Sequence, residues 1–253
     1  MATLKIKNMV IGEGMPKIIV PLVGKTEEDL LIEAAYVKEL GPDAIEWRVD
    51  CFEHVENLEA VKAVLAKLRF IFKQELLLFT FRSHTEGGNK EISEDFYIQL
   101  NETAIRTKQI DLVDIELFQQ KETIKALVTA ANENGVFVVM SNHDFTKTPA
   151  KEEIITRLCS MQNLGAHILK MAVMPKSAGD VLTLLNATYT MKTEHTNRPL
   201  IMMAMAGTGL ISRLAGEIFG SAFTFAAGKE SSAPGQMPIE ELRPILESLH
   251  KRL

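Results

Sequence analysis

Apolar and polar residues follow a regular repeat along the chain, in which short apolar runs are separated by longer amphipathic segments. The apolar runs have the length of β-strands and lie at 17–23, 44–49, 75–82, 112–116, 136–142, 167–173, 200–204 and 222–227. The segments between them carry apolar residues at helical spacing. Strands that alternate with helices in units of about thirty residues favour a closed parallel (β/α)8 barrel.

Several helices have recognisable starts. Thr26 precedes three acidic residues and is a predicted N-cap, and Ser93, Thr148 and Ser177 are predicted to begin helices in the same way. The stretch 5–11 predicts a small hairpin that closes the bottom of the barrel. A Rossmann-like sheet is the competing fold, but it would place a GxGxxG turn after the first strand, and the residues there are Val-Gly-Lys.

Length and composition indicate one catalytic barrel domain over residues 1–253, since a chain of this size builds one substantial core. The net charge of −5 provides no basic field that would attract nucleic acid. No stretch approaches the roughly 18 apolar residues of a membrane span, and the first ten residues are too short and too charged for a signal peptide. We therefore expect a cytoplasmic protein. Cys51 and Cys159 form no CxxC pair and are expected to be buried thiols.

Charged residues gather at the carboxyl ends of the predicted strands, where a barrel of this type carries its active site. Side chains two apart on a strand share a face. The groups expected to point the same way are Glu46, Arg48 and Asp50; Thr80 and Arg82; Asp114 and Glu116; and Ser141 and His143. Structural ion pairs lining the barrel mouth are the alternative for any single pair, but repetition on strand after strand favours a functional site.

Lys170 interrupts an apolar run and shares a strand face with Ile168 and Ala172. A free lysine has a pKa near 10.4, so action as an amine nucleophile requires a pKa lower by about 3 units. Apolar surroundings and nearby arginines would achieve this, and such an amine suits imine formation with a ketone. The alternative is a strand-end lysine whose ammonium reaches water.

His143 follows the apolar run that ends at 140, so it is expected at the carboxyl end of a strand, where a neutral imidazole suits a general base. A hydrogen-bonded structural histidine is the alternative. Glu86 lies before Gly87 and Gly88, a pair that lets the loop bend sharply and approach a ligand closely.

Two loops late in the chain are candidate anion sites. Residues 206–209 lead into a helix that contains Arg213, and residues 231–236 follow the last predicted strand. Barrels often bind phosphate at these positions, and a carboxylate would suit Arg213 as a two-pronged donor. Turns without a ligand remain the alternative.

Motifs spread over nearly the whole chain make it similar to the type I 3-dehydroquinate dehydratase family. They are EWRVD at 46–50, FTFRS at 79–83, EGG at 86–88, SNHDF at 141–145, ILKMAVMP at 168–175, ISRLAGE at 211–217 and SAPGQ at 232–236. The resemblance implies a hydro-lyase that converts 3-dehydroquinate to 3-dehydroshikimate in the shikimate pathway of aromatic amino acid biosynthesis. It implies that Lys170 forms the imine, that His143 moves the proton, and that Glu86 hydrogen-bonds to His143.

The resemblance also implies how the substrate is held. The residues implied at the substrate carboxylate are Arg213, Ser232 and Gln236. Those implied at the ring hydroxyls and ketone are Glu46, Arg48 and Arg82. Those implied as apolar walls are Met203, Met205 and Phe225. Asp114 would support this network from behind, and the resemblance implies a homodimer that needs no metal and no organic cofactor.

Two other functions remain open from the residues alone. A Schiff-base aldolase of the transaldolase kind also uses a barrel lysine, but it would bind a sugar phosphate at the late loops, where Arg213 and Gln236 suit a planar carboxylate better. A catalytically inactive barrel could serve as a binding or regulatory module, although it would not need Lys170, His143 and Glu86 together.

Overall fold

Parallel strands form the central sheet of the computed structural model, which describes residues 3–229 and 233–253. The strands are β3 (Lys17–Leu22), β4 (Ala44–Arg48), β5 (Leu76–Thr80), β6 (Leu112–Glu116), β7 (Phe137–Asp144), β8 (Ile168–Val173), β9 (Leu200–Ala204) and β10 (Phe223–Phe225). Their order in the eight-stranded sheet is β10-β3-β4-β5-β6-β7-β8-β9. Ala222 donates its backbone N–H to the carbonyl of Leu200 at 2.7 Å, which brings β10 beside β9 and nearly closes the barrel. The predicted (β/α)8 fold is confirmed.

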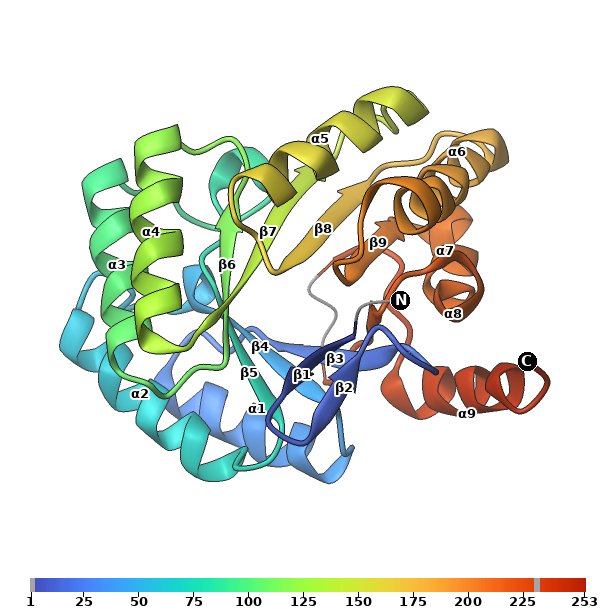
Figure 1. The fold of residues 1–253 in the computed structure, drawn as a ribbon. Coiled ribbons are helices and arrows are strands. Elements are labelled where there is room, and N and C mark those ends of the chain that lie inside the picture. The colour runs from blue at the N-terminus through green and yellow to red at the C-terminus, as the bar shows by residue number, and fades with distance from the viewer. Residues whose placement is uncertain (1–2, 230–232) are drawn as a thin grey trace.

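Helices surround the sheet on its outer side (Figure 1). They are α1 (Glu27–Glu39), α2 (Leu58–Ile71), α3 (Glu94–Arg106), α4 (Lys121–Asn134), α5 (Lys151–Asn163), α6 (Ala178–Thr190), α7 (Leu210–Leu214), α8 (Gly216–Phe219) and α9 (Ile239–His250). Short 3-10 turns lie at η1 (Val49–Cys51), η2 (His84–Glu86) and η4 (Gly207–Gly209), and a π turn, η3 (Met191–His195), follows α6. Within the described ranges, no helix combines the length and apolarity needed to cross a membrane.

Three of the four predicted helix starts are confirmed by their hydrogen bonds. The hydroxyls of Thr26, Ser93 and Ser177 each accept a backbone N–H from the first turn of α1, α3 and α6. The start predicted at Thr148 is wrong. Helix α5 begins after Ala150, whose side chain offers no acceptor, and the buried hydroxyl of Thr148 forms no hydrogen bond with any described residue.

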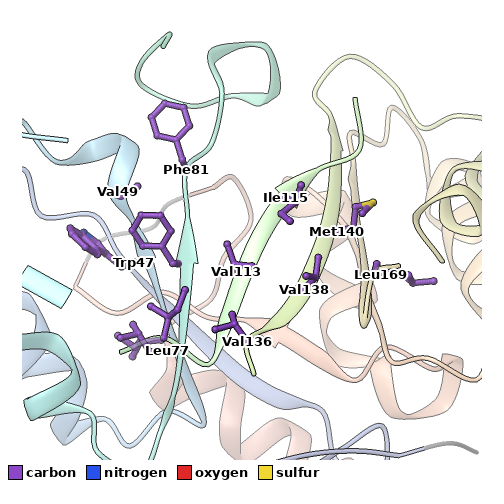
Figure 2. Packing of buried hydrophobic residues seen from close by; sticks show 14 of the residues in the cluster. Trp47, Val49, Leu77, Phe81, Val113, Ile115, Val136, Val138, Met140 and Leu169 are labelled. Atoms are coloured by element: carbon purple, nitrogen blue, oxygen red, sulfur yellow. The ribbon is translucent and has the colours of Figure 1, made fainter. Parts of the chain in front are cut away.

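Strand side chains divide between two apolar cores. Those that face outward pack against the helices, and Figure 2 shows part of this layer, with Trp47, Val113 and Met140 among its members. Those that face inward at the amino ends of the strands form the second core inside the barrel. Toward the carboxyl ends of the strands the inward-facing side chains become charged, and the pocket lies at this end of the barrel.

The N-terminal hairpin is present as predicted, with β1 (Leu4–Ile6) paired antiparallel to β2 (Met9–Ile11). Ile6 and Ile11 are buried and belong to the core inside the barrel, together with Leu76 and Leu112 from the amino ends of β5 and β6. The hairpin therefore closes the bottom of the barrel.

The two cysteines are free thiols as expected, but they are half-buried rather than buried. Cys51 ends the 3-10 turn η1, where the chain leaves the barrel wall. Burial and the neighbouring carboxylate of Asp50 raise the pKa of the Cys51 thiol to about 11.

Candidate active site

A pocket of about 500 Å³, part of it open to solvent, lies at the carboxyl ends of the strands. The residues that line it are Glu46, Arg48, Arg82, Glu86, Gly87, His143, Phe145, Lys170, Ala172, Met203, Met205, Arg213, Phe225, Ala233 and Gln236.

Lys170 projects into the barrel from the middle of β8 and is 3% exposed. Its Nζ lies 3.2 Å from Oε1 of Glu46 and 3.1 Å from Oδ2 of Asp114. The ring of Phe225 lies 4.8 Å from the same nitrogen. The expected apolar environment is therefore wrong for the nitrogen itself, because two carboxylates hold it.

Arg82 lines the pocket, connects several carboxylates around it and is itself buried. Its Nη1 donates to Glu116 at 2.8 Å and to Ser141 at 3.0 Å, and it lies 3.4 Å from Glu86. Its Nη2 lies 2.9 Å from Asp114, in an ion pair whose angle is not that of a hydrogen bond. Burial alone would lower the pKa of Arg82, but the surrounding carboxylates raise it well above its usual value.

The charged side chains of β4 and its following turn also pair with one another. Arg48 donates from Nε and Nη2 to both oxygens of Asp50, at 2.8 and 2.9 Å. Glu46 accepts a hydrogen bond from the hydroxyl of Thr80 at 2.9 Å. These contacts confirm that the alternating polar residues of neighbouring strands face one side.

His143 and Glu86 make direct contact although 57 residues separate them in the chain. Oε2 of Glu86 lies 2.9 Å from Nδ1 of His143 and also accepts the backbone N–H of His143 at 3.0 Å. Oε1 of Glu86 accepts the side-chain amide of Asn142 at 3.0 Å. The carboxylate therefore defines the orientation of the ring, with Nε2 left for the pocket.

Burial favours the uncharged forms of both His143 and Glu86. Burial and the positive charges of Arg82 and Lys170 hold the pKa of His143 well below its usual value, so the ring is neutral at neutral pH. Burial raises the pKa of Glu86 to about 7, and Glu116 adds to this rise while Arg82 opposes it. A neutral imidazole beside a carboxyl that can hold a proton is suited to proton transfer.

The loop that carries Glu86 depends on its two glycines. Gly87 has a φ of 85°, in the left-handed region, and the ring of Phe145 packs where its side chain would be. A Cβ at Gly88 would lie 1.8 Å from the carbonyl oxygen of Arg82. The expectation that this loop bends sharply is confirmed, and the bend turns Glu86 inward so that it is buried.

Arg213 is a buried cation that makes no ion pair with a carboxylate among the residues the structure describes. It contacts the carbonyls of Phe225 at 3.5 Å and Pro234 at 3.3 Å, and no described residue forms a hydrogen bond with its Nε. Burial lowers the pKa of Arg213 to about 10. Gln236 lines the pocket on the same side, whereas Ser232 lies outside the described residues.

With the exception of Ser232, the predicted site residues line one pocket. Sequence reasoning missed residues in two places. The residue missed in the pocket wall is Phe145, whereas Gly87 and Ala233 lie in loops that were expected to approach a ligand, and Ala172 lies on the strand face expected for Lys170. Those missed in the network behind the pocket are Asn142 and Arg157. Asn142 and Phe145 lie inside the SNHDF motif and could have been noticed, whereas no motif marks Arg157.

The arrangement can perform a specific set of chemical operations. A buried primary amine can condense with a ketone, a neutral imidazole can exchange a proton, and a guanidinium without a carboxylate partner can hold an anion. In the part of the chain that the structure describes, no group of three His, Cys, Asp or Glu side chains is placed to hold a metal ion.

Comparison with known proteins found close similarity over the whole chain. The model of the type I 3-dehydroquinase family matches residues 18–252. The 3-dehydroquinate dehydratase of Bacillus subtilis is 62% identical over 99% of this chain and 98% of its own length. A type I 3-dehydroquinate dehydratase from Clostridium difficile, solved with covalent modified comenic acid, is 52% identical, covers 100% of this chain and 99% of its own, and superposes with a TM-score of 0.97.

Proposed function

The chain belongs to the type I 3-dehydroquinase family, and on this premise we propose that it dehydrates 3-dehydroquinate to 3-dehydroshikimate through an imine on Lys170. The single observation that carries the proposal is that the amine of Lys170 and the imidazole of His143 line one pocket. The enzyme is a hydro-lyase of the shikimate pathway, which supplies aromatic amino acid biosynthesis.

The reaction begins at the ketone carbon of the substrate. Glu46 and Asp114 lie within hydrogen-bonding distance of the Lys170 nitrogen and can accept its proton before the attack. A C–N bond forms, the carbonyl oxygen leaves as water with two protons from nitrogen, and a protonated imine remains. The positive imine withdraws electrons from the neighbouring carbon, which makes its proton acidic.

His143 then performs both proton transfers of the elimination. Its neutral ring takes the proton from the carbon beside the imine, and the electron pair moves into an enamine. The resulting imidazolium gives that proton to the departing hydroxyl, so water leaves as the enamine electrons form the new carbon–carbon double bond. Hydrolysis of the imine releases the product and restores Lys170, while Glu86 keeps the ring oriented throughout.

The remaining pocket residues bind the substrate. Residues proposed at its carboxylate are Arg213, Gln236 and Ser232. Residues proposed at the ring hydroxyls and ketone are Glu46, Arg48 and Arg82, with Asp114 supporting them. Residues proposed as apolar walls are Met203, Met205 and Phe225. A guanidinium with no carboxylate partner among the described residues supports the first assignment, since a planar carboxylate satisfies it with two hydrogen bonds.

Borohydride trapping tests the proposed function. The protein is mixed with 3-dehydroquinate and borohydride, and the tryptic peptides are weighed. A reduced adduct on Lys170, together with turnover, is the expected result. An adduct formed only with sugar phosphates would instead indicate a Schiff-base aldolase, and no adduct with either would indicate a binding module.

We propose further that the chain acts as one (β/α)8 domain over residues 1–253, as a homodimer in the cytoplasm, and without a metal or an organic cofactor. Sedimentation equilibrium measures the oligomeric state, and cell fractionation measures the location. Prolonged treatment with a chelator is expected to leave the rate unchanged, and strong inhibition would contradict the metal-free proposal.

A further inference from the structure

Arg157, on helix α5, is connected to the imidazole of His143 by an unbroken chain of hydrogen bonds. Its Nη1 donates to Oδ1 of Asn142 at 2.8 Å, and Nδ2 of Asn142 donates to Oε1 of Glu86 at 3.0 Å. Oε2 of Glu86 then contacts Nδ1 of His143. Arg157 is not one of the described residues that line the pocket, so it acts on the site only through these neighbours.

The chemistry of the chain dictates how the amide of Asn142 is oriented. A guanidinium can only donate hydrogen bonds, so the amide oxygen of Asn142 faces Arg157 and its NH2 group is left for Oε1 of Glu86. The amide between Arg157 and Glu86 therefore satisfies both neighbours in one orientation alone. Asn142 is 2% exposed, so water cannot compensate for the reversed orientation. Arg157 thus holds the Asn142 NH2 group toward Glu86.

Asn142 in turn determines where the carboxylate of Glu86 points. One oxygen accepts Asn142, and the other accepts both the backbone and the ring of His143. Arg82 approaches the second oxygen only at 3.4 Å, and its shorter hydrogen bonds go elsewhere. Without the hydrogen bond from Asn142, the carboxylate is free to rotate toward Arg82 and away from the ring.

We propose that Arg157 and Asn142 are positioning residues for the dehydration, which through Glu86 hold the imidazole of His143 in the orientation that exchanges a proton with the substrate. This inference rests on the proposed function of His143 as the base. Groups that support a reacting side chain from behind affect rate more than substrate binding, because they act on its orientation.

The other contacts of Arg157 offer matched controls. On its outer side it pairs with Glu153, it lies 3.9 Å from Asp144, and its guanidinium covers the ring of Phe118 at 5.4 Å. Glu153→Gln and Phe118→Leu each remove an outer contact and leave the hydrogen bond to Asn142 intact. If Arg157 mattered only for the stability of α5, these variants would slow the enzyme as well.

A double-mutant cycle tests the proposal. Arg157→Leu is expected to lower kcat about 3- to 10-fold, and Asn142→Ala about 10- to 100-fold, each with KM within about 2-fold of wild type. The double variant is expected to have the same kcat as Asn142→Ala alone, because Arg157 acts on the site through Asn142. Arg157→Lys, which keeps a cationic donor, should recover part of the rate, and both control variants should match wild type.

The pH profile of kcat/KM supplies a readout that a structural role would not move. The charged groups around Glu86 and His143 are Arg82, Glu116, Asp114, Arg48 and Lys170, and all remain in place in the variants. The hydrogen bond from the Asn142 amide lowers the pKa of Glu86, so its loss raises that pKa. The acid limb of the pH profile is therefore expected at higher pH in Arg157→Leu and at an unchanged pH in Glu153→Gln.

Two results would overturn the inference. These are a kcat of Arg157→Leu within about 2-fold of wild type, or equal fold losses in the Asn142→Ala and wild-type backgrounds. Arg157→Gln takes the place of the leucine variant in the same cycle if that variant does not fold, with the same criteria. Wild-type protein that neither turns over substrate nor forms the Lys170 adduct would instead refute the proposed function.

Discussion

The ammonium nitrogen of Lys170 lies 3.1 Å from the carboxylate of Asp114, and both side chains are buried inside the barrel. Asp114 also pairs with Arg82 and accepts the hydroxyl of Ser141 at 2.6 Å. Burial alone would raise the pKa of Asp114, but these partners lower it, so the carboxylate stays ionised. The nucleophile therefore rests in an ion pair and must leave it before it reacts.

Lys170→Ala should abolish turnover and adduct formation. The free energy of unfolding is expected to fall by about 2 kcal/mol, because Asp114 loses one cation but keeps Arg82. Lys62→Ala is the control, since its exposed pair with Glu59 contributes little. Turnover assays and urea unfolding measure both effects, and residual activity near the wild-type rate would contradict the mechanism.

His143→Ala should separate imine formation from elimination. We expect kcat to fall about 10²- to 10⁴-fold, the usual contribution of a positioned base. Borohydride should still trap an adduct, because the amine lies on β8 and remains present. His54→Ala changes an exposed histidine and should leave kcat unchanged. Equal losses in both variants would argue against a specific role for His143.

Arg213→Met should weaken substrate binding without weakening the fold. Loss of a two-pronged hydrogen bond to the substrate carboxylate is expected to raise KM about 10- to 100-fold. The free energy of unfolding should stay the same or rise by about 1 kcal/mol, because a buried cation that has no carboxylate partner among the described residues is removed. Arg106→Met, at an exposed position, is the control. An unchanged KM would refute the carboxylate assignment.

Glu86→Gln should change how stability depends on pH. The pKa of Glu86 is about 7 in the folded protein and near 4.5 in the unfolded chain, so between these values the folded state binds more protons. The resulting stabilisation is complete below pH 4.5 and is lost as the pH rises through 7. The variant's unfolding free energy relative to wild type should therefore rise between about pH 5 and about pH 8, by up to about 3 kcal/mol.

Urea unfolding of Glu86→Gln and wild type at about pH 5 and about pH 8 measures the difference in their unfolding free energies. The low pKa of His143 acts in the opposite sense below pH 6.5, and both proteins carry that residue. A difference between variant and wild type that is the same at both pH values would show that Glu86 does not bind its proton near neutrality.

Gly88→Ala should disturb the loop that carries Glu86. Its Cβ would lie 1.8 Å from a backbone oxygen, so the loop must move, at an expected cost of about 1–3 kcal/mol in unfolding free energy and with a lower kcat. Gly207→Ala is the matched control near the same pocket, because among the described residues no atom beyond its two chain neighbours lies within 4 Å of the added carbon. Thermal unfolding and rate assays distinguish the two, and equal effects would contradict the steric argument.

The barrel could be predicted from the sequence because each strand and helix carries its own local signal. The strands at 112–116 and 200–204 match β6 and β9 in both bounds. The last strand is shorter than predicted, since Ala227 pairs only as an isolated bridge with Pro238. Thr148 failed as a cap because a sequence rule cannot tell which hydroxyl ends up beside the first turn of a helix.

The polar face of the site could also be predicted, because alternation along a strand decides which residues share a side. The partners within it could not. The pairing of Lys170 with Glu46 depends on how strands far apart in the chain face one another across the barrel. Arg157 lies on an outer helix and gains its connection to the site only when α5 packs beside β7.

The hairpin under the barrel has a consequence for the catalytic cycle. Because Ile6 and Ile11 fill the amino end of the barrel interior, Lys170 is approached from the pocket at the opposite end. The cycle releases one water when the imine forms and one in the elimination, and it consumes one to free the product. These waters pass through the same pocket that takes up a ring-sized acid, so the product still attached to the lysine stands in the path of the water that must detach it.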